Sequence, residues 1–286
     1  VATSSQIWII TVITLFATVS VVSGVERGIK LLSQFNILLA LGVLLFVFVA
    51  GPTLFQLKLF TSTVGDYLQN FVQMSFWMEM KEDASWQKGW TVFYWGWWVS
   101  WSPFVGIFVA RVSKGRTIKE FVTMVFLAPT LVTFLWLSVF GGSGLYVEIF
   151  GGGGMSEAIS ENVALSLQAL FAHLPFPTLM TAVATLLVIT FFITSSDSGS
   201  LVDDMVTSGG HPDPPTAQRV FWAFAEGAVA IVLLYTGGLA ALQTASITSG
   251  LPITVLLLFS AYGLLKALRA DVANDGNLEG VSSGAS

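Results

Sequence analysis

The chain has 286 residues, of which 54% are hydrophobic and only 10% are charged. A soluble domain carries about 25% charged residues, so this composition excludes a water-soluble globular protein and predicts one embedded in a lipid bilayer. The absence of cysteine excludes disulfides, thiolate catalysis and Cys-ligated metals. The net charge of -5 indicates no particular partner, and we expect no nucleic acid among the partners.

The first stretch, "VATSSQIWIITVITLF", has no basic region and no small-residue cleavage site, so it does not resemble a signal peptide. We expect it to be the middle of a protein, entered just before a membrane helix, with a natural chain that is longer at this end.

Seven apolar runs are long enough to cross a bilayer, at about 20 residues each. They are 6–24, 35–57, 90–110, 120–141, 178–196, 218–236 and 247–268. The segment 66–80 is too short and too polar to span, but its apolar residues recur at helical spacing, so we expect a helix lying in the membrane interface. The segment 161–174 is a second candidate for such a helix.

Basic residues cluster on one side of the predicted spans. If the spans alternate in direction, one face receives the following residues: Arg27, Lys30, Arg111, Lys114, Arg116, Lys119, Arg219, Lys266 and Arg269. The positive-inside rule makes that face cytoplasmic, with the N-terminus of the chain outside and its C-terminus inside. Lys58, Lys81 and Lys88 depart from this trend.

An aromatic stripe fills the third predicted span, where 94–104 reads "YWGWWVSWSPF". On a helix, Trp97, Trp98, Trp101 and Phe104 share one broad face that runs through mid-span, whereas aromatic belts sit at the two interfaces. These rings would serve either packing and lipid contact or cation binding. Pro103 removes a backbone N–H, and a helix disturbed at membrane depth must be covered or line a cavity. Ring faces also hold a quaternary ammonium, which has no N–H to donate, at roughly 0.5–2 kcal/mol each.

A hydroxyl cluster, "TFFITSSDS", closes the fifth predicted span at 190–198. Such hydroxyls commonly bond back to their own helix or across to a neighbour. The alternative is a sodium site, because adjacent hydroxyls and a carbonyl one turn back offer three oxygens to a hard cation. Asp197 is either a functional charge or a marker of the cytoplasmic membrane boundary.

The stretch "FYWGWWVSWSPFVGIFVARVSKGRTIKEF" (93–121) closely resembles the signature of the betaine/carnitine/choline transporters, and 32–53 and 190–200 also look like that family. The resemblance implies an all-α integral membrane protein with two inverted five-helix repeats, the LeuT-like architecture. It divides the chain into the last helices of the first repeat (1–60), an extracellular loop with the interfacial helix (61–89), the second repeat (90–270) and an acidic flexible tail (271–286). The opening helices, including a glycine-rich unwound one, would then lie outside this chain.

The resemblance also implies roles for individual residues. It assigns Trp97, Trp98 and Trp101 to the substrate site, with Trp98 most directly on a trimethylammonium group and Phe104 near the same cavity. It places sodium on the Thr194 and Ser195 side chains and the Phe191 carbonyl. No cofactor is expected apart from sodium as coupling ion, and the family implies a homotrimer.

The expected function is therefore the import of glycine betaine or a similar solute by a sodium-coupled secondary transporter in the cytoplasmic membrane. Alternatives are a choline or carnitine transporter that uses protons or sodium-independent exchange, and a quaternary-ammonium sensor that does not transport. An intramembrane enzyme is not expected, because the sequence has no cysteine, no HExxH motif and only two histidines, both in predicted loops.

Overall fold

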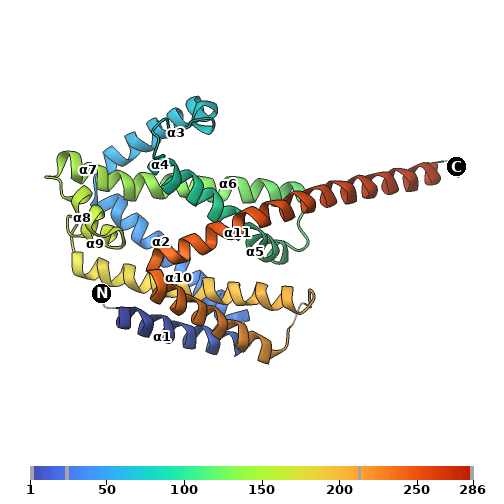
Figure 1. Cartoon of the computed structure of the whole chain (residues 1–286). Coiled ribbons are helices and arrows are strands. Elements are labelled where there is room, and N and C mark those ends of the chain that lie inside the picture. Colours follow the sequence, from blue (N-terminus) through green and yellow to red (C-terminus); the bar gives the residue numbers. More distant parts are fainter. Residues whose placement is uncertain (1–2, 23–25, 212–213, 284–286) are drawn as a thin grey trace. The chain divides into compact units, whose positions relative to one another are not determined.

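The computed structural model describes residues 3–22, 26–211 and 214–283, without the side chains of 20–22, 26–30, 197, 239 and 274–283. The elements in this described part are all helical (Figure 1). In chain order they are α1 (Thr3–Val22), α2 (Glu26–Ala50), α3 (Thr53–Ser75), α4 (Ser85–Gln87), the π-helix η1 (Lys88–Val92), α5 (Phe93–Val112), α6 (Ile118–Trp136), the π-helix η2 (Leu137–Gly141), α7 (Gly142–Phe150), α8 (Met155–Glu161), the 3₁₀-helix η3 (Val163–Leu165), α9 (Ser166–Phe171), α10 (Pro177–Thr207) and α11 (Thr216–Ser283).

Each of the seven predicted spans lies mostly within helical structure. Among the described residues, five helical segments are long and apolar enough to cross a membrane: Leu31–Ala50, Ile118–Phe150, Pro177–Thr207, Thr216–Gly238 and Ala240–Ala273. The apolar part of α1, Thr3–Val19, is shorter. The helix α5 has the length, but its Trp, Tyr, Gly, Ser and Pro residues make it less hydrophobic than the other five segments.

The predicted second span, 35–57, is wrong at its end. The helix α2 stops at Ala50, and α3 starts at Thr53 after Gly51 and Pro52. Pro52 cannot donate a backbone hydrogen bond, which favours a helix boundary here. The buried Gln56 fixes the bend, because its Nε2 donates to the Val47 carbonyl at 3.2 Å and to Ser143 Oγ at 2.7 Å.

The predicted interfacial helices are also revised. The segment 66–80 is helical only as far as Ser75, and it continues α3 from Thr53 instead of forming a separate helix. The segment 161–174 is split, since α8 ends at Glu161 and the short helices η3 and α9 follow. Apolar spacing predicted helix in both places, but it did not predict where the helices begin and end.

The chain divides into two compact units that are discontinuous in sequence. The first contains Val1–Trp77 and Ser113–Ala228, and the second contains Met78–Val112 and Val229–Ser286. The division of the chain into repeats, loop and tail stays a prediction.

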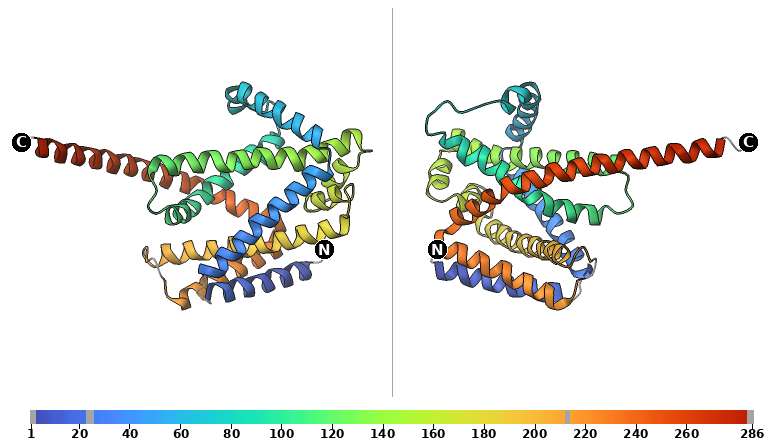
Figure 2. Two further views of the ribbon diagram at one scale, coloured as in Figure 1. Left: turned by 180° about the vertical axis from the view of Figure 1, so that it is seen from behind. Right: turned by 45° about the vertical axis from the view of Figure 1, so that its right-hand side comes forward.

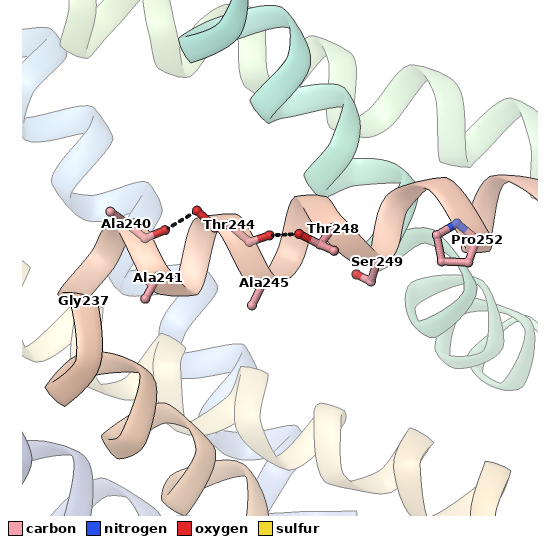
Figure 3. Close-up of a pocket in the computed structure, with 8 residues that line it drawn as sticks. All are labelled: Gly237, Ala240, Ala241, Thr244, Ala245, Thr248, Ser249 and Pro252. Carbon is pink, nitrogen blue, oxygen red and sulfur yellow. Dashed lines mark hydrogen bonds between the residues drawn. The ribbon is translucent and has the colours of Figure 1, made fainter.

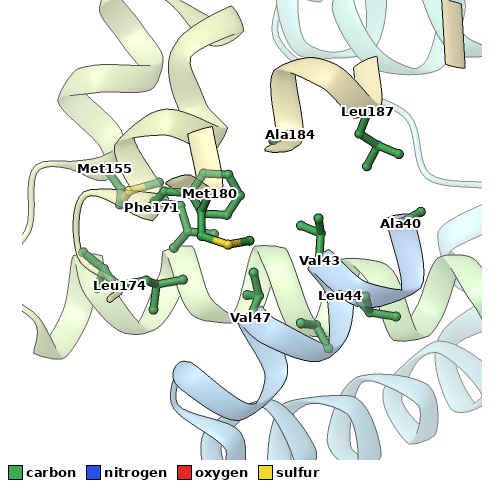
Figure 4. Close-up of a cluster of buried hydrophobic side chains, with 13 residues drawn as sticks. Ala40, Val43, Leu44, Val47, Met155, Phe171, Leu174, Met180, Ala184 and Leu187 are labelled. Atoms are coloured by element: carbon green, nitrogen blue, oxygen red, sulfur yellow. The ribbon is translucent and has the colours of Figure 1, made fainter. Parts of the chain in front are cut away.

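In the first unit, α10 packs against α1 and α2 (Figure 2). The buried residues of α2 recur at helical spacing and meet a matching set on α10, with α8 and α9 closing one end (Figure 4). This core consists of Ala40, Val43, Leu44, Val47, Val139, Val147, Met155, Leu170, Phe171, Leu174, Met180, Ala184 and Leu187. The opposite faces of the helices expose large apolar residues such as Leu38, Leu45 and Val188, as helices that face lipid do.

The long helix α11 contains one break, at Gly238. Its backbone there has φ 62° and ψ −147°, a conformation that glycine adopts without a Cβ penalty. The predicted sixth and seventh spans are therefore two helical segments, Thr216–Gly238 and Ala240–Ala273, joined at this residue.

Candidate functional site

The aromatic stripe lies on α5, which follows a π-helical turn, Lys88–Val92. π-helical turns are rare and occur frequently at functional sites. Within the stripe, Trp98 and Trp101 form a close pair, with ring centroids 5.8 Å apart and ring planes at 90°. The spacing of three residues places both indoles on one face of the helix. Two perpendicular rings form two adjoining walls of an aromatic box.

Trp97 belongs to a different group of rings. Its indole stacks on Phe93, with centroids 5.8 Å apart and planes at 18°, and lies 6.1 Å from the ring of Tyr94. The structure therefore brings Trp98 and Trp101 together but gives Trp97 other aromatic partners. Phe104 lies one turn beyond Trp101 and is half-buried.

The rings of the pair are accessible. Trp98 is 57% exposed and Trp101 is 45% exposed, so their unit leaves part of each ring free to contact a ligand. Trp95, on the same helix, is 70% exposed and has no predicted role in the site. It therefore offers a control of the same residue type.

Pro103 does not break α5, which contradicts the expected disturbance of this helix. The helix runs from Phe93 to Val112 with Pro103 inside it. Proline has no N–H for the Val99 carbonyl four residues earlier. Ser102 Oγ donates to that carbonyl at 2.8 Å instead, which restores its hydrogen bond and lets the helix continue.

A close helix crossing fixes α5 against the later part of α11 in the second unit. Ser100 Oγ lies 2.6 Å from the Ser246 carbonyl and 2.7 Å from the Gly96 carbonyl. A Cβ on Gly250 would lie 3.1 Å from the Gly96 carbonyl oxygen and 3.3 Å from Ser100 Oγ. Small residues on both helices thus permit near backbone contact, a usual device of membrane helices. This crossing lies one turn from Trp98 and Trp101 and fixes the helix that carries them.

An open hollow of about 830 Å³ follows the same segment of α11 (Figure 3). It is lined by Gly237, Ala240, Ala241, Thr244, Ala245, Thr248, Ser249 and Pro252. The Thr244 hydroxyl donates to the Ala240 carbonyl and the Thr248 hydroxyl to the Thr244 carbonyl, so these donors are used within the helix. The hollow does not supply a polar site.

The candidate ion site lies in the first unit, on α10. Thr194 is buried, and its Oγ1 donates to the carbonyls of Phe191 at 2.9 Å and Thr190 at 3.2 Å. It also accepts a hydrogen bond from Asn36 Nδ2 on α2 at 3.2 Å. The Thr194 hydroxyl and the Phe191 carbonyl, two of the three oxygens assigned by resemblance, therefore lie side by side. Ser195 is exposed, and the side chain of Asp197 lies outside the described residues.

Asn36 is a residue that the sequence reasoning missed. It is 1% exposed, and its Oδ1 is buried without a hydrogen-bond partner. An unpaired amide oxygen is a strong neutral acceptor, and buried polar groups normally have partners. The sequence does indicate this residue, because Asn36 is a lone amide within the apolar run 35–50, and polar residues inside membrane spans are usually functional.

The chain matches the betaine/carnitine/choline transporter family over residues 1–273. It belongs to that family. It is 45% identical, over 93% of its length, to a glycine betaine/proline/choline transporter and to glycine betaine transporter 1, both of Vibrio parahaemolyticus. It is also 42% identical, over 92% of its length, to a probable glycine betaine transporter of Desulfitobacterium hafniense. The chain covers 47%, 51% and 53% of these three relatives, so it spans about half the length of the curated relatives it matches.

Membership in this transporter family makes the chain part of a multi-pass membrane protein. It accounts for the many exposed leucines, valines and phenylalanines, since such side chains are stable at surfaces that do not face water. Polar groups at membrane depth are usually functional in membrane proteins, so the aromatic groups of α5 and the polar groups of α10 are the candidate site residues.

Proposed function

We propose that the protein is a secondary active transporter that imports glycine betaine or a similar quaternary-ammonium solute by alternating access, coupled to sodium. The observation that carries the proposal is the perpendicular pair of indoles, Trp98 and Trp101. Two relatives are named as transporters of glycine betaine, one of them also of proline and choline, which supports the same class of solute.

The chemistry of the pair suits a trimethylammonium group. Such a cation offers no hydrogen-bond donor, so it is held by electrostatic attraction to ring faces and by methyl contacts. Two perpendicular rings contact the rounded group from two directions, which a parallel stack does not do. At roughly 0.5–2 kcal/mol per ring, the pair contributes a few kcal/mol, and a micromolar site needs about 8 kcal/mol. Trp97 and Phe104, both assigned by family resemblance, and further polar contacts would add the rest.

For sodium, we propose a site formed by the Thr194 hydroxyl and the Phe191 carbonyl, with Ser195 as a further ligand. Asn36, whose Nδ2 donates to Thr194 and whose buried Oδ1 has no hydrogen-bond partner, supports a site of neutral oxygens here. In this structure the Thr194 hydroxyl donates a hydrogen bond to the Phe191 carbonyl. An ion between these two oxygens would require the hydroxyl to turn, so that both oxygens present lone pairs to the cation.

We further propose the cytoplasmic membrane as location, with the N-terminus of this chain outside and its C-terminus inside, following the placement of Lys and Arg. The inverted-repeat architecture and the homotrimer are proposals by family resemblance. Alternating access would be a relative movement of the repeats around the bound solute.

The proposal is tested by uptake of radiolabelled glycine betaine into proteoliposomes under an inward sodium gradient, with potassium as replacement at equal ionic strength. We expect saturable uptake that requires sodium and that Trp98→Ala weakens. Binding without uptake would favour the sensor, and uptake that ignores sodium would favour exchange or proton coupling. If Trp98→Ala and Trp95→Ala had equal effects, the indole pair would not be the substrate site.

A further inference from the structure

The helices α7, α8 and α9 pack together in the first unit (Figure 1) and border a partly open pocket of about 340 Å³. Most of its lining is apolar, and its wall residues include Phe140, Leu145, Ile159 and Leu167. Small-molecule sites usually measure about 300–1,000 Å³ and combine apolar walls with a few polar groups. This pocket therefore has the size and the lining of a small-molecule site, and it contains none of the residues assigned above.

Glu148 on α7 is the one charged side chain among the described residues that line the pocket. Its Oε2 accepts hydrogen bonds from the backbone amides of Met155 at 2.8 Å and Ser156 at 3.2 Å. These bonds fix the carboxylate against the start of α8. They do not balance its negative charge with a cation, because no Lys, Arg or His is among the described lining residues.

The chain around the pocket is also poor in positive charge. Between positions 138 and 176 the sequence contains Glu148, Glu157 and Glu161 but no Lys or Arg. His173 lies in this stretch, but it is exposed and does not line the pocket. A carboxylate beside apolar walls attracts a cation more strongly than one in water, because the effective dielectric constant is lower. The pocket therefore favours a positively charged ligand.

A lipid chain is a less suitable occupant. A second pocket in the same unit, of about 380 Å³, is lined by residues such as Leu59, Tyr67 and Phe134 and by no charged side chain. That lining is compatible with a hydrocarbon chain. In the pocket of Glu148 a hydrocarbon chain would remove water from the carboxylate and offer no compensating charge, which is costly. A cation supplies that charge.

The ligand that fits both the apolar walls and the carboxylate is a small quaternary-ammonium cation. Its methyl groups contact the apolar walls, and the ring of Phe140 adds an aromatic contact. Its positive charge is attracted by Glu148 without any N–H to donate, which suits a carboxylate that already accepts two backbone hydrogen bonds. A zwitterion such as glycine betaine brings a carboxylate of its own, which Glu148 repels.

We propose that the pocket around Glu148 is a second binding site, which takes a small quaternary-ammonium cation without a carboxylate and rejects zwitterions. Glu148 lies near the end of the candidate span Ile118–Phe150. In the orientation proposed above, this end is on the outer side of the membrane, where a cation from outside reaches it. The site goes beyond the proposed transport function, because it uses none of the residues assigned to solute or sodium.

The test is equilibrium binding of radiolabelled choline to the purified protein, with unlabelled glycine betaine in excess to fill the proposed solute site. We expect saturable choline binding that glycine betaine does not displace. Glu148→Gln should weaken this binding roughly tenfold, because the amide keeps an oxygen for the backbone of α8 but lacks the charge. Glu157→Gln changes an exposed acid on α8 outside the pocket, so it is the matched control and should bind like the parent.

Three results would overturn the proposal. Glycine betaine could displace all of the choline, Glu148→Gln could bind choline like the parent, or Glu157→Gln could lose as much affinity as Glu148→Gln. The same assay in Trp98→Ala separates this site from the indole pair. Choline binding that Trp98→Ala retains supports the pocket whether or not the protein transports glycine betaine, whereas binding that it loses assigns the choline to the indoles and overturns the proposal.

A second variant tests the pocket without changing the carboxylate. Gly144 lines the pocket, and a Cβ added there would lie 3.6 Å from Met155 Cε, which is ordinary contact. Gly144→Val therefore fills part of the pocket and should also weaken choline binding. Thermal unfolding of the same samples shows which variants are folded, so Gly144→Val decides if Glu148→Gln does not fold. Parental choline affinity in a folded Gly144→Val protein would contradict binding in this pocket.

Discussion

Asn36 on α2 and Thr194 on α10 are joined side chain to side chain, with Nδ2 and Oγ1 3.2 Å apart, although 158 residues separate them in the sequence. The bond links two helices of the first unit that otherwise meet through apolar contacts. It also connects Asn36, whose Oδ1 is buried without a hydrogen-bond partner, to one of the candidate sodium ligands.

We expect Asn36→Ala to raise the sodium concentration for half-maximal uptake roughly fivefold, equivalent to about 1 kcal/mol, because the amide that orients the Thr194 hydroxyl is lost. The measurement is uptake of labelled glycine betaine against sodium at fixed ionic strength. Gln34→Ala, an exposed amide on the same helix, is the matched control and should change little. Equal effects of the two variants would remove Asn36 from the ion site.

Thr194→Ala combined with Ser195→Ala should also raise the sodium requirement, with a smaller effect on solute binding at saturating sodium. The sodium requirement rises because ligands of the ion are lost. Sodium and solute are linked, so each binds more tightly when the other is bound, and saturating sodium restores most of the solute affinity. Sodium titrations at low and at saturating solute measure this coupling. If the double variant kept the sodium dependence of the parent, the assignment of these hydroxyls would be wrong.

Trp98→Ala should weaken glycine betaine binding by about 1–2 kcal/mol, or roughly 5- to 30-fold, because one wall of the perpendicular pair is removed. Trp98→Phe should retain part of the affinity, since phenylalanine keeps a weaker ring face. Equilibrium binding of labelled solute to purified protein measures both variants. Trp95→Ala is the matched control, and Trp98→Leu with parental affinity would exclude a cation–π site.

Gly250→Ala should weaken solute binding without removing any aromatic ring. The added Cβ would lie 3.1 Å from the Gly96 carbonyl oxygen, tighter than ordinary contact, so we expect α5 and its indoles to move by a few tenths of an ångström. Gly263→Ala, on the same helix with no atom within 4 Å of the added Cβ, is the control and should bind normally. Equilibrium binding measures the effect on solute affinity. Thermal unfolding of the same samples shows whether the variant is folded, and so distinguishes a shift of the indoles from a loss of folding. Normal binding by Gly250→Ala would show that the crossing does not position the indoles.

Gly51→Ala should destabilise the protein by about 1–3 kcal/mol. A Cβ at this position would lie 2.6 Å from the Val47 carbonyl oxygen and 2.9 Å from Gln56 Nε2, so both the backbone at the bend and the Gln56 hydrogen bonds to Val47 and Ser143 would be disturbed. Gly42→Ala on α2 has no atom within 4 Å of the added Cβ and should not lower stability, because alanine favours a helix. The check is the Tm of the three proteins in the same detergent. A Gly51→Ala protein as stable as the parent would show that the bend does not depend on this close packing of Gly51 against Val47 and Gln56.

The sequence by itself determined the class of the protein and the location of its helices. The low content of charge excluded a water-soluble fold, and apolar runs of span length located the membrane helices, because both follow from local composition. The dense indoles of 94–104 and the hydroxyls of 190–198 identified the candidate sites, because their residue types are unusual at membrane depth.

Only the tertiary structure decided which of these groups meet. Asn36 became a candidate because α2 packs on α10 and places its amide against Thr194. The ring of Trp98 pairs with Trp101, whereas the ring of Trp97 stacks on Phe93. Helical spacing does not determine these ring orientations. Such contacts depend on how helices distant in sequence cross, and local composition does not determine the crossing.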